Sequence, residues 1–250
     1  GHFATNHSHI NYYIDITYQK TRLSEAKDSA FDLVSHFIND TPVDTVLCLD
    51  GTAVLGTCVA EELTKSGFRT ISTCSLKFEN VRVPAFNLVG GEAGLGKGFG
   101  FAMKTLDKSR ACVGALAVGI ARRALDEAIA FVKERVTFGA PVSKRQGIQW
   151  MIAEMATKIE ASRLLVSHAN FLQQNGLPFS KEAAMAKMFA TESAMSVCTD
   201  AIQLMGGKGY MKEDCVEKIW RDIKAYCIFE GTNQIQKIVI SGAVLSGKGH

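Results

Sequence analysis

The fold is decided by residues 111–135, ACVGALAVGIARRALDEAIAFVKER. Apolar residues recur in this stretch at three- and four-residue steps, at Val113, Leu116, Ala117, Ile120, Ala124, Ala128 and Phe131. Because 3.6 residues complete one helical turn, this spacing gathers the apolar side chains on one face. The stretch therefore predicts a long amphipathic helix whose apolar side packs on other helices.

Four more helical patterns follow, separated by turns that contain glycine or proline. Their approximate ranges are 147–175, 180–205, 216–223 and a last one after Thr232. Serine is favoured at helix N-termini, so we expect Ser180 to cap the helix that it begins. Long helices joined by short loops most simply form an antiparallel four-helix bundle.

The first 75 residues have a different pattern. Val43–Leu49 and Phe68–Thr73 have strand composition, and Ala53–Lys65 between them has helical composition, which makes one β-α-β unit. We therefore expect an α/β segment over residues 1–75, a strand and glycine-rich linker over 76–100, and a helical domain over 101–250. The predicted fold class is mainly α, a four-helix bundle preceded by a small α/β segment.

Composition excludes several classes of function. Lys and Arg number 28 against 25 Asp and Glu, and no basic cluster tracks a phosphate backbone, so nucleic acid is not an expected partner. The uncharged run Ala111–Ala121 is far shorter than the roughly 20 residues of a membrane span, so none is expected. Seven scattered cysteines without a C-x-x-C pair indicate reduced thiols. This favours the cytoplasm, or the mitochondrial matrix of a eukaryote.

Two further patterns are weak candidates for binding sites. Residues 91–98, GEAGLGKG, approach a phosphate-binding P-loop, but Gly98 stands where a Ser or Thr hydroxyl should bind Mg²⁺. A flexible turn into the first long helix fits better. His2, His7 and His9 have no carboxylate or thiol at a suitable spacing, so no metal site is expected.

Residues 226–234, YCIFEGTNQ, do not fit a purely structural pattern. Glu230 lies there between an aromatic residue and a Gly-Thr pair that begins a helix. Partial desolvation would raise the pKa of this carboxyl toward that of a general base. The same carboxylate could instead favour the positive end of the helix that follows. The pattern alone does not separate the two interpretations.

Residues 76–250 resemble the C-terminal part of the acyl-CoA dehydrogenases in five motifs that agree in order and spacing. The motifs are FENVRVP at 78–84, LDKSR at 106–110, RVTFG at 135–139, QLMGGKGY at 203–210 and FEGTNQIQ at 229–236. The resemblance implies the end of a middle β-domain followed by a four-helix bundle. It also implies a homo-oligomer, a dimer or tetramer, with FAD at subunit interfaces.

The resemblance assigns Glu230 the place of the glutamate that removes the α-proton of an acyl-CoA thioester while the β-hydrogen leaves as hydride to FAD. Some relatives carry this base on the helix of the 106–110 motif, where this chain has Ser109. Glu230 is then the only candidate base. The resemblance places Arg110, Phe229 and Gly231 near the acyl-CoA.

The resemblance also implies FAD-binding residues and a redox partner. The residues expected at the FAD pyrophosphate and adenine are Arg135, Thr137 and Phe138. Those expected at the FAD of a neighbouring subunit are Gln146, Gln203, Gly206 and Gly207, and further FAD contacts are Thr232 and Gln234. Electron-transfer flavoprotein is the expected electron acceptor.

Residues 1–75 depart from the family, whose members have an N-terminal helical domain and most of a β-domain before the Phe78 strand. They resemble, less specifically, part of a phosphoribosyltransferase-like protein in residues 9–15 and 43–52. Two alternatives to the dehydrogenase follow. One is a phosphate-binding module centred on residues 50–56, and the other is a truncated, non-catalytic fusion.

Overall fold

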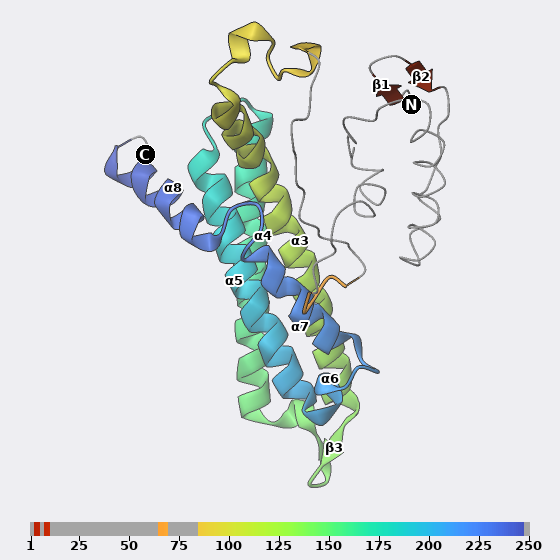
Figure 1. Ribbon diagram of the computed structural model, residues 1–250. Helices are drawn as coiled ribbons and strands as arrows, with labels where there is room; N and C mark the ends of the chain where they lie inside the picture. The colour runs from red at the N-terminus through yellow and green to blue at the C-terminus, as the bar shows by residue number, and fades with distance from the viewer. Residues whose placement is uncertain (1–2, 6–7, 11–64, 70–84, 248–250) are drawn as a thin grey trace. The chain divides into compact units, whose positions relative to one another are not determined.

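The computed structural model describes residues 3–5, 8–10, 65–69 and 85–247, which fall in two compact units (Figure 1). In the first unit, strands β1 (Phe3–Thr5) and β2 (Ser8–Ile10) pair antiparallel. The 3-10 helices η2 (Ala85–Asn87) and η3 (Glu92–Gly94) belong to the same unit. The β-α-β unit expected over residues 43–73 and the strand at 78–83 lie outside the described residues, apart from 65–69.

The second unit is helical. Its helices are α3 (Gly98–Glu134), α4 (Gln146–Gln174), α5 (Ser180–Met205), α6 (Gly207–Tyr210), α7 (Cys215–Tyr226) and α8 (Asn233–Leu245). Helices α3, α4 and α5 alternate in direction along one bundle, and α7 returns antiparallel to α5 (Figure 1). The predicted antiparallel helical bundle is therefore confirmed.

Two helix starts differ from expectation. Helix α3 begins at Gly98 rather than near Ala111, so its first three residues come from the segment that we assigned to the linker. Phe179, and not Ser180, holds the N-cap position of α5. The Ser180 hydroxyl instead donates a hydrogen bond to Asp107 Oδ2 of α3 at 2.6 Å. A tertiary partner thus replaces the local cap.

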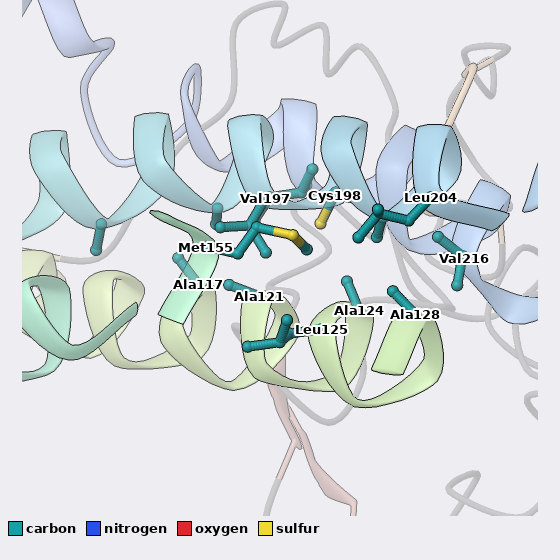
Figure 2. Close-up of a cluster of buried hydrophobic side chains, with 14 of the residues drawn as sticks. Ala117, Ala121, Ala124, Leu125, Ala128, Met155, Val197, Cys198, Leu204 and Val216 are labelled. Carbon is teal, nitrogen blue, oxygen red and sulfur yellow. The ribbon is translucent and has the colours of Figure 1, made fainter. Parts of the chain in front are cut away.

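The core lies among α3, α4, α5 and α7, and alanine is its commonest residue (Figure 2). The alanines that α3 and α5 contribute to this cluster are Ala117, Ala121, Ala124, Ala128, Ala190, Ala194 and Ala201. Small side chains let two helix backbones approach closely. Met155 of α4 is fully buried in the same cluster. Leu116, which we expected on the buried face, is 56% exposed.

Among the described residues, two cations are buried. Arg110 of α3 pairs with Asp107, one turn earlier. Lys187 of α5 is fully buried, and its Nζ donates hydrogen bonds to the Gly231 carbonyl at 2.9 Å and to Asn233 Oδ1 at 2.8 Å. A buried charge is tolerated only where fixed acceptors replace water. Lys187 therefore ties α5 to the segment between α7 and α8.

Within the described ranges, no helix combines the length and the apolar character that crossing a membrane would require. The same residues contain no group of three or more His, Cys, Asp or Glu side chains arranged to hold a metal ion. The four cysteines in this part of the chain are unpaired.

We predict opposite effects for two alanine substitutions in α3. A Cβ at Gly114 would meet Val166 Cγ2 at 2.9 Å and the Ala186 carbonyl oxygen at 3.2 Å, whereas a Cβ at Gly119 meets nothing within 4 Å. Gly114→Ala should lower the free energy of unfolding by about 1–3 kcal/mol through overpacking. Gly119→Ala should raise it by up to about 1 kcal/mol through helix propensity. Urea unfolding followed by circular dichroism tests this, and equal shifts would contradict the packing described.

Lys187 should give the folding stability a measurable pH dependence. Burial lowers the pKa of Lys187 from 10.5 to about 8. The ionisable groups that influence it are Cys227, Arg110, Glu192 and Glu230. Between pH 8 and 10.5 the unfolded lysine keeps a proton that the folded one has lost, so unfolding takes up protons and stability rises with pH. The wild type should gain stability relative to Lys187→Met across this window, and a constant difference would contradict the burial.

Candidate active site

The turn between α7 and α8 holds Glu230 in a strained conformation. Glu230 has φ +55° and Gly231 has φ +83°, both in the left-handed region. For a residue with a side chain this conformation costs roughly 1–2 kcal/mol, and such residues cluster at functional sites. The turn therefore needs anchors that hold it against relaxation.

The anchors converge on the carbonyl of Gly231. This oxygen accepts hydrogen bonds from Lys187 Nζ and from Gln236 Nε2, each at 2.9 Å. The N–H of Asn233 donates to the Cys227 carbonyl at 3.1 Å and closes the turn. The Thr232 hydroxyl caps α8 by accepting from the Ile235 N–H at 3.4 Å. The sequence interpretation of Thr232 as the start of this helix is confirmed.

The Glu230 carboxylate lies against α3. Ser109 Oγ donates a hydrogen bond to Glu230 Oε2 at 2.6 Å, across a separation of 121 residues. No described residue hydrogen-bonds Glu230 Oε1 or the backbone N–H of Glu230. One carboxylate oxygen is thus fixed by a donor, while the other oxygen and the neighbouring N–H stay available to a ligand.

The residues expected near an acyl-CoA differ in how accessible they are to a ligand. Phe229 is 40% exposed, and its ring packs against that of Tyr226 at an angle of 55°, with centroids 4.8 Å apart. Gly231 follows Glu230 directly, but its carbonyl is already occupied. Arg110 is only 2% exposed and is paired with Asp107, while its Nε has no partner among the described residues. Its predicted contact with a substrate stays a prediction that the burial does not favour.

A second group of predicted residues lies at the other end of α3. Strands β3 (Val136–Thr137) and β4 (Ala140–Pro141) form a hairpin that we did not expect. Its two turn residues, Phe138 and Gly139, have φ of +50° and +78°, the signs of a type I′ turn. The Phe138 ring is 97% exposed, and the Arg145 guanidinium lies 5.2 Å from its centroid.

Other residues predicted to bind FAD gather at this end too. Arg135 is exposed beside the hairpin, and Gln146 begins α4 after the short 3-10 helix η4 (Val142–Lys144). Gln203, Gly206 and Gly207 are exposed where α5 ends and α6 begins. Helix α6 reaches the same end of α3, because Lys208 Nζ lies 5.7 Å from the Phe131 ring centroid.

The two groups are far apart within one chain. Ser109 and Glu134 are 25 residues apart in α3, a distance of about 38 Å at 1.5 Å per residue. Thr232 and the exposed Gln234 lie with Glu230, whereas the hairpin and the α5–α6 junction lie at the opposite end. The structure therefore separates the predicted FAD contacts into two clusters.

Sequence reasoning missed two residues of the Glu230 site. Ser109 was considered only as the place of an absent base, not as the donor to Glu230. Lys187 was not singled out, although it shares its helical face with Ala183, Ala190 and Ala194, which are all buried. A charged residue within a buried stripe was the available signal.

Known proteins match the helical unit. The family model described as the C-terminal domain of acyl-CoA dehydrogenases matches residues 96–245. A short-chain specific acyl-CoA dehydrogenase of Clostridium acetobutylicum is 49% identical over 180 residues, 72% of this chain and 47% of that protein. A subunit of the caffeyl-CoA reductase–Etf complex of Acetobacterium woodii is 45% identical over 181 residues, 72% of this chain and 47% of that protein.

A solved structure of an acyl-CoA dehydrogenase also matches the helical unit. Butyryl-CoA dehydrogenase from Megasphaera elsdenii superimposes with a TM-score of 0.71 at 45% identity, over 74% of this chain and 48% of that one. This chain spans about half the length of the relatives that it matches. None of these matches supports the phosphoribosyltransferase resemblance of residues 1–75. Motif, fold and relatives agree, and the chain belongs to the acyl-CoA dehydrogenase family.

Proposed function

We propose that this chain carries the catalytic base of a flavin-dependent α,β-dehydrogenation of an acyl-CoA thioester, and that Glu230 is that base. The observation that carries the proposal is the strained turn at residues 230 and 231. It presents a carboxylate with one oxygen fixed by Ser109 and the other available. A strained, anchored carboxylate on the rim of a bundle is better explained by catalysis than by helix capping, because Thr232 already caps α8.

Glu230 would act on a C–H bond that is only weakly acidic. The carboxylate takes the α-proton, the electron pair of that bond forms the new C=C bond, and the β-hydrogen leaves with its electron pair. Negative charge develops on the thioester oxygen, so a donor aimed at that oxygen stabilises the transition state. The unpaired N–H of Glu230 is a donor beside the base. FAD, when bound, supplies the acceptor for the departing hydride.

The hairpin end of the bundle suits the other half of FAD. Arg135 offers an exposed guanidinium, which can donate two parallel hydrogen bonds to a pyrophosphate, and no described residue pairs with it. The Phe138 ring is almost fully exposed, as an aromatic that packs on a ligand or partner would be. Glycines at 206 and 207 add no side chain that would block the approach of a ligand.

The separation of the two clusters supports an oligomer. About 38 Å of α3 lies between the Glu230 turn and the hairpin, which is farther than one FAD spans. If both clusters bind FAD, they contact different FAD molecules or the same FAD from different copies of the chain. We infer that a homodimer or tetramer completes each site.

The names of the relatives support a proposal for the substrate and the redox partner. One of them is named for short acyl chains and another for butyryl-CoA, so we propose a short acyl-CoA as the substrate. Another relative belongs to an Etf complex, which supports an electron-transfer flavoprotein as partner. In the reductive direction Glu230 would return the proton to the α-carbon. The alternative phosphate-binding module, centred on residues 50–56, lies outside the described residues.

Glu230→Gln should abolish turnover while keeping the shape of the side chain. Loss of a general base lowers rates by about 100-fold or more. The measurement is anaerobic bleaching of the flavin absorbance by butyryl-CoA, in purified protein supplied with FAD. Glu154→Gln, an exposed glutamate of α4, is the matched control and should bleach like the wild type. Bleaching of the Glu230→Gln protein at the wild-type rate would remove Glu230 from the mechanism.

Arg135→Ala should weaken FAD binding without changing the bundle. A hydrogen bond to a charged group contributes about 1.5–3 kcal/mol, which corresponds to a loss of affinity of roughly tenfold or more. Fluorescence titration with FAD measures it. Arg122→Ala removes an exposed arginine from the side of α3 and should leave the affinity unchanged. Equal affinities of the two variants would count against the hairpin as an FAD contact.

A further inference from the structure

Lys187 is a charged residue where helix packing calls for a small apolar one. Ala183, Ala190 and Ala194 lie on the same face of α5, and all are fully or almost fully buried. Burying an ammonium group costs solvation free energy, so its hydrogen-bond acceptors explain its presence. Both acceptors, the Gly231 carbonyl and the Asn233 side chain, belong to the segment just after Glu230. The buried charge therefore stabilises the turn after Glu230 and does not contribute to apolar packing in the bundle.

We propose that Lys187 is a positioning residue for Glu230, which it serves by holding the Gly231 carbonyl so that residues 230 and 231 keep their left-handed conformation. The inference rests on the proposed role of Glu230 as the base. Lys187 itself touches neither the carboxylate nor any atom that would react. Its effect passes through the backbone of the turn.

A closed hydrogen-bond network supports this role. Asn233 Oδ1 accepts from Lys187 Nζ at 2.8 Å, and Asn233 Nδ2 donates to Thr191 Oγ1 at 3.1 Å. Thr191 lies one turn after Lys187 in α5, and its hydroxyl contacts the Lys187 carbonyl at 2.9 Å. All three side chains are buried. A buried network whose members satisfy one another favours a single arrangement.

Lys187 also differs from the other donor to the same oxygen. Gln236 Nε2 binds the Gly231 carbonyl at 2.9 Å, but Gln236 belongs to α8 and would move with the turn. Lys187 belongs to α5. Among the described residues it is the side chain that joins this carbonyl to a long helix of the bundle. Ser109 holds the carboxylate from α3, so the turn is fixed from two long helices.

Residue-resolved hydrogen exchange tests the proposal without relying on catalysis. The probes are the amides of Phe229, Asn233 and Gln236, which donate to the carbonyls of Ala225, Cys227 and Thr232. In Lys187→Met these amides should exchange roughly tenfold or more faster, as the loss of hydrogen bonds from a charged donor implies. Val132→Ala is the control, because Val132 is fully buried near the far end of α3. It should weaken the bundle without a specific effect on the three probes.

Steady-state kinetics with butyryl-CoA supply the second readout, expressed per bound FAD. Lys187→Met should lower kcat at least about tenfold and leave KM within about twofold, because misplacing a base raises the barrier rather than weakening substrate binding. Val132→Ala should change neither constant. If Lys187→Met does not fold, Asn233→Ala should shift exchange and kcat in the same direction by less, since the Gly231 carbonyl keeps its ammonium donor.

The outcomes separate the two proposals. Unchanged exchange at the three probes, or faster exchange that Val132→Ala matches, overturns the positioning role. So does a loosened turn with an unchanged kcat in an enzyme that Glu230→Gln inactivates. If Glu230→Gln stays active, the proposed base is wrong, whereas faster exchange at the three probes would still show that Lys187 holds the turn.

Discussion

Close packing of α3 on α5 is the constraint on which the site depends. Both helices contribute buried alanines to one core cluster, and Figure 2 shows those of α3 facing α5. Small side chains let two helix backbones approach closely. Two features fix their relative register, the hydrogen bond from Ser180 to Asp107 and the lack of a side chain at Gly114, where a Cβ would lie 3.2 Å from the Ala186 carbonyl oxygen. This register brings Ser109 of α3 and Lys187 of α5 to the same turn. A bulkier interface would separate the two donors that hold it.

The turn between α7 and α8 holds the Glu230 carboxylate in a fixed position. The left-handed conformation of Glu230 is unfavourable alone and persists because buried donors fix the Gly231 carbonyl. The helices contribute precision, since groups on packed helices move less than groups on free loops. The hairpin after α3 is not anchored in this way, and its tight turn carries the exposed ring of Phe138. One end of the bundle thus fixes a carboxylate, and the other presents an exposed aromatic ring.

The sequence predicted what depends on local pattern. Helix α4 was expected at 147–175 and runs Gln146–Gln174, because both its periodicity and the NGLP segment that ends it are local features. The start of α3 was misplaced, since residues 98–110 lack the apolar spacing of the segment after them. Ser109 and Lys187 bind the Glu230 turn over separations of 121 and 44 residues, which no short motif encodes. Family resemblance supplied Glu230, which the pattern alone left ambiguous.

The most direct measurement is a crystal structure of the protein with FAD and an acyl-CoA analogue that cannot be oxidised. A base must lie close to the proton that it removes, so a Glu230 carboxylate oxygen should be about 3–3.5 Å from the α-carbon. The same structure should show Ser109 still bonded to the other oxygen. A carboxylate that faces away from the thioester, with another side chain at the α-carbon, would contradict the account.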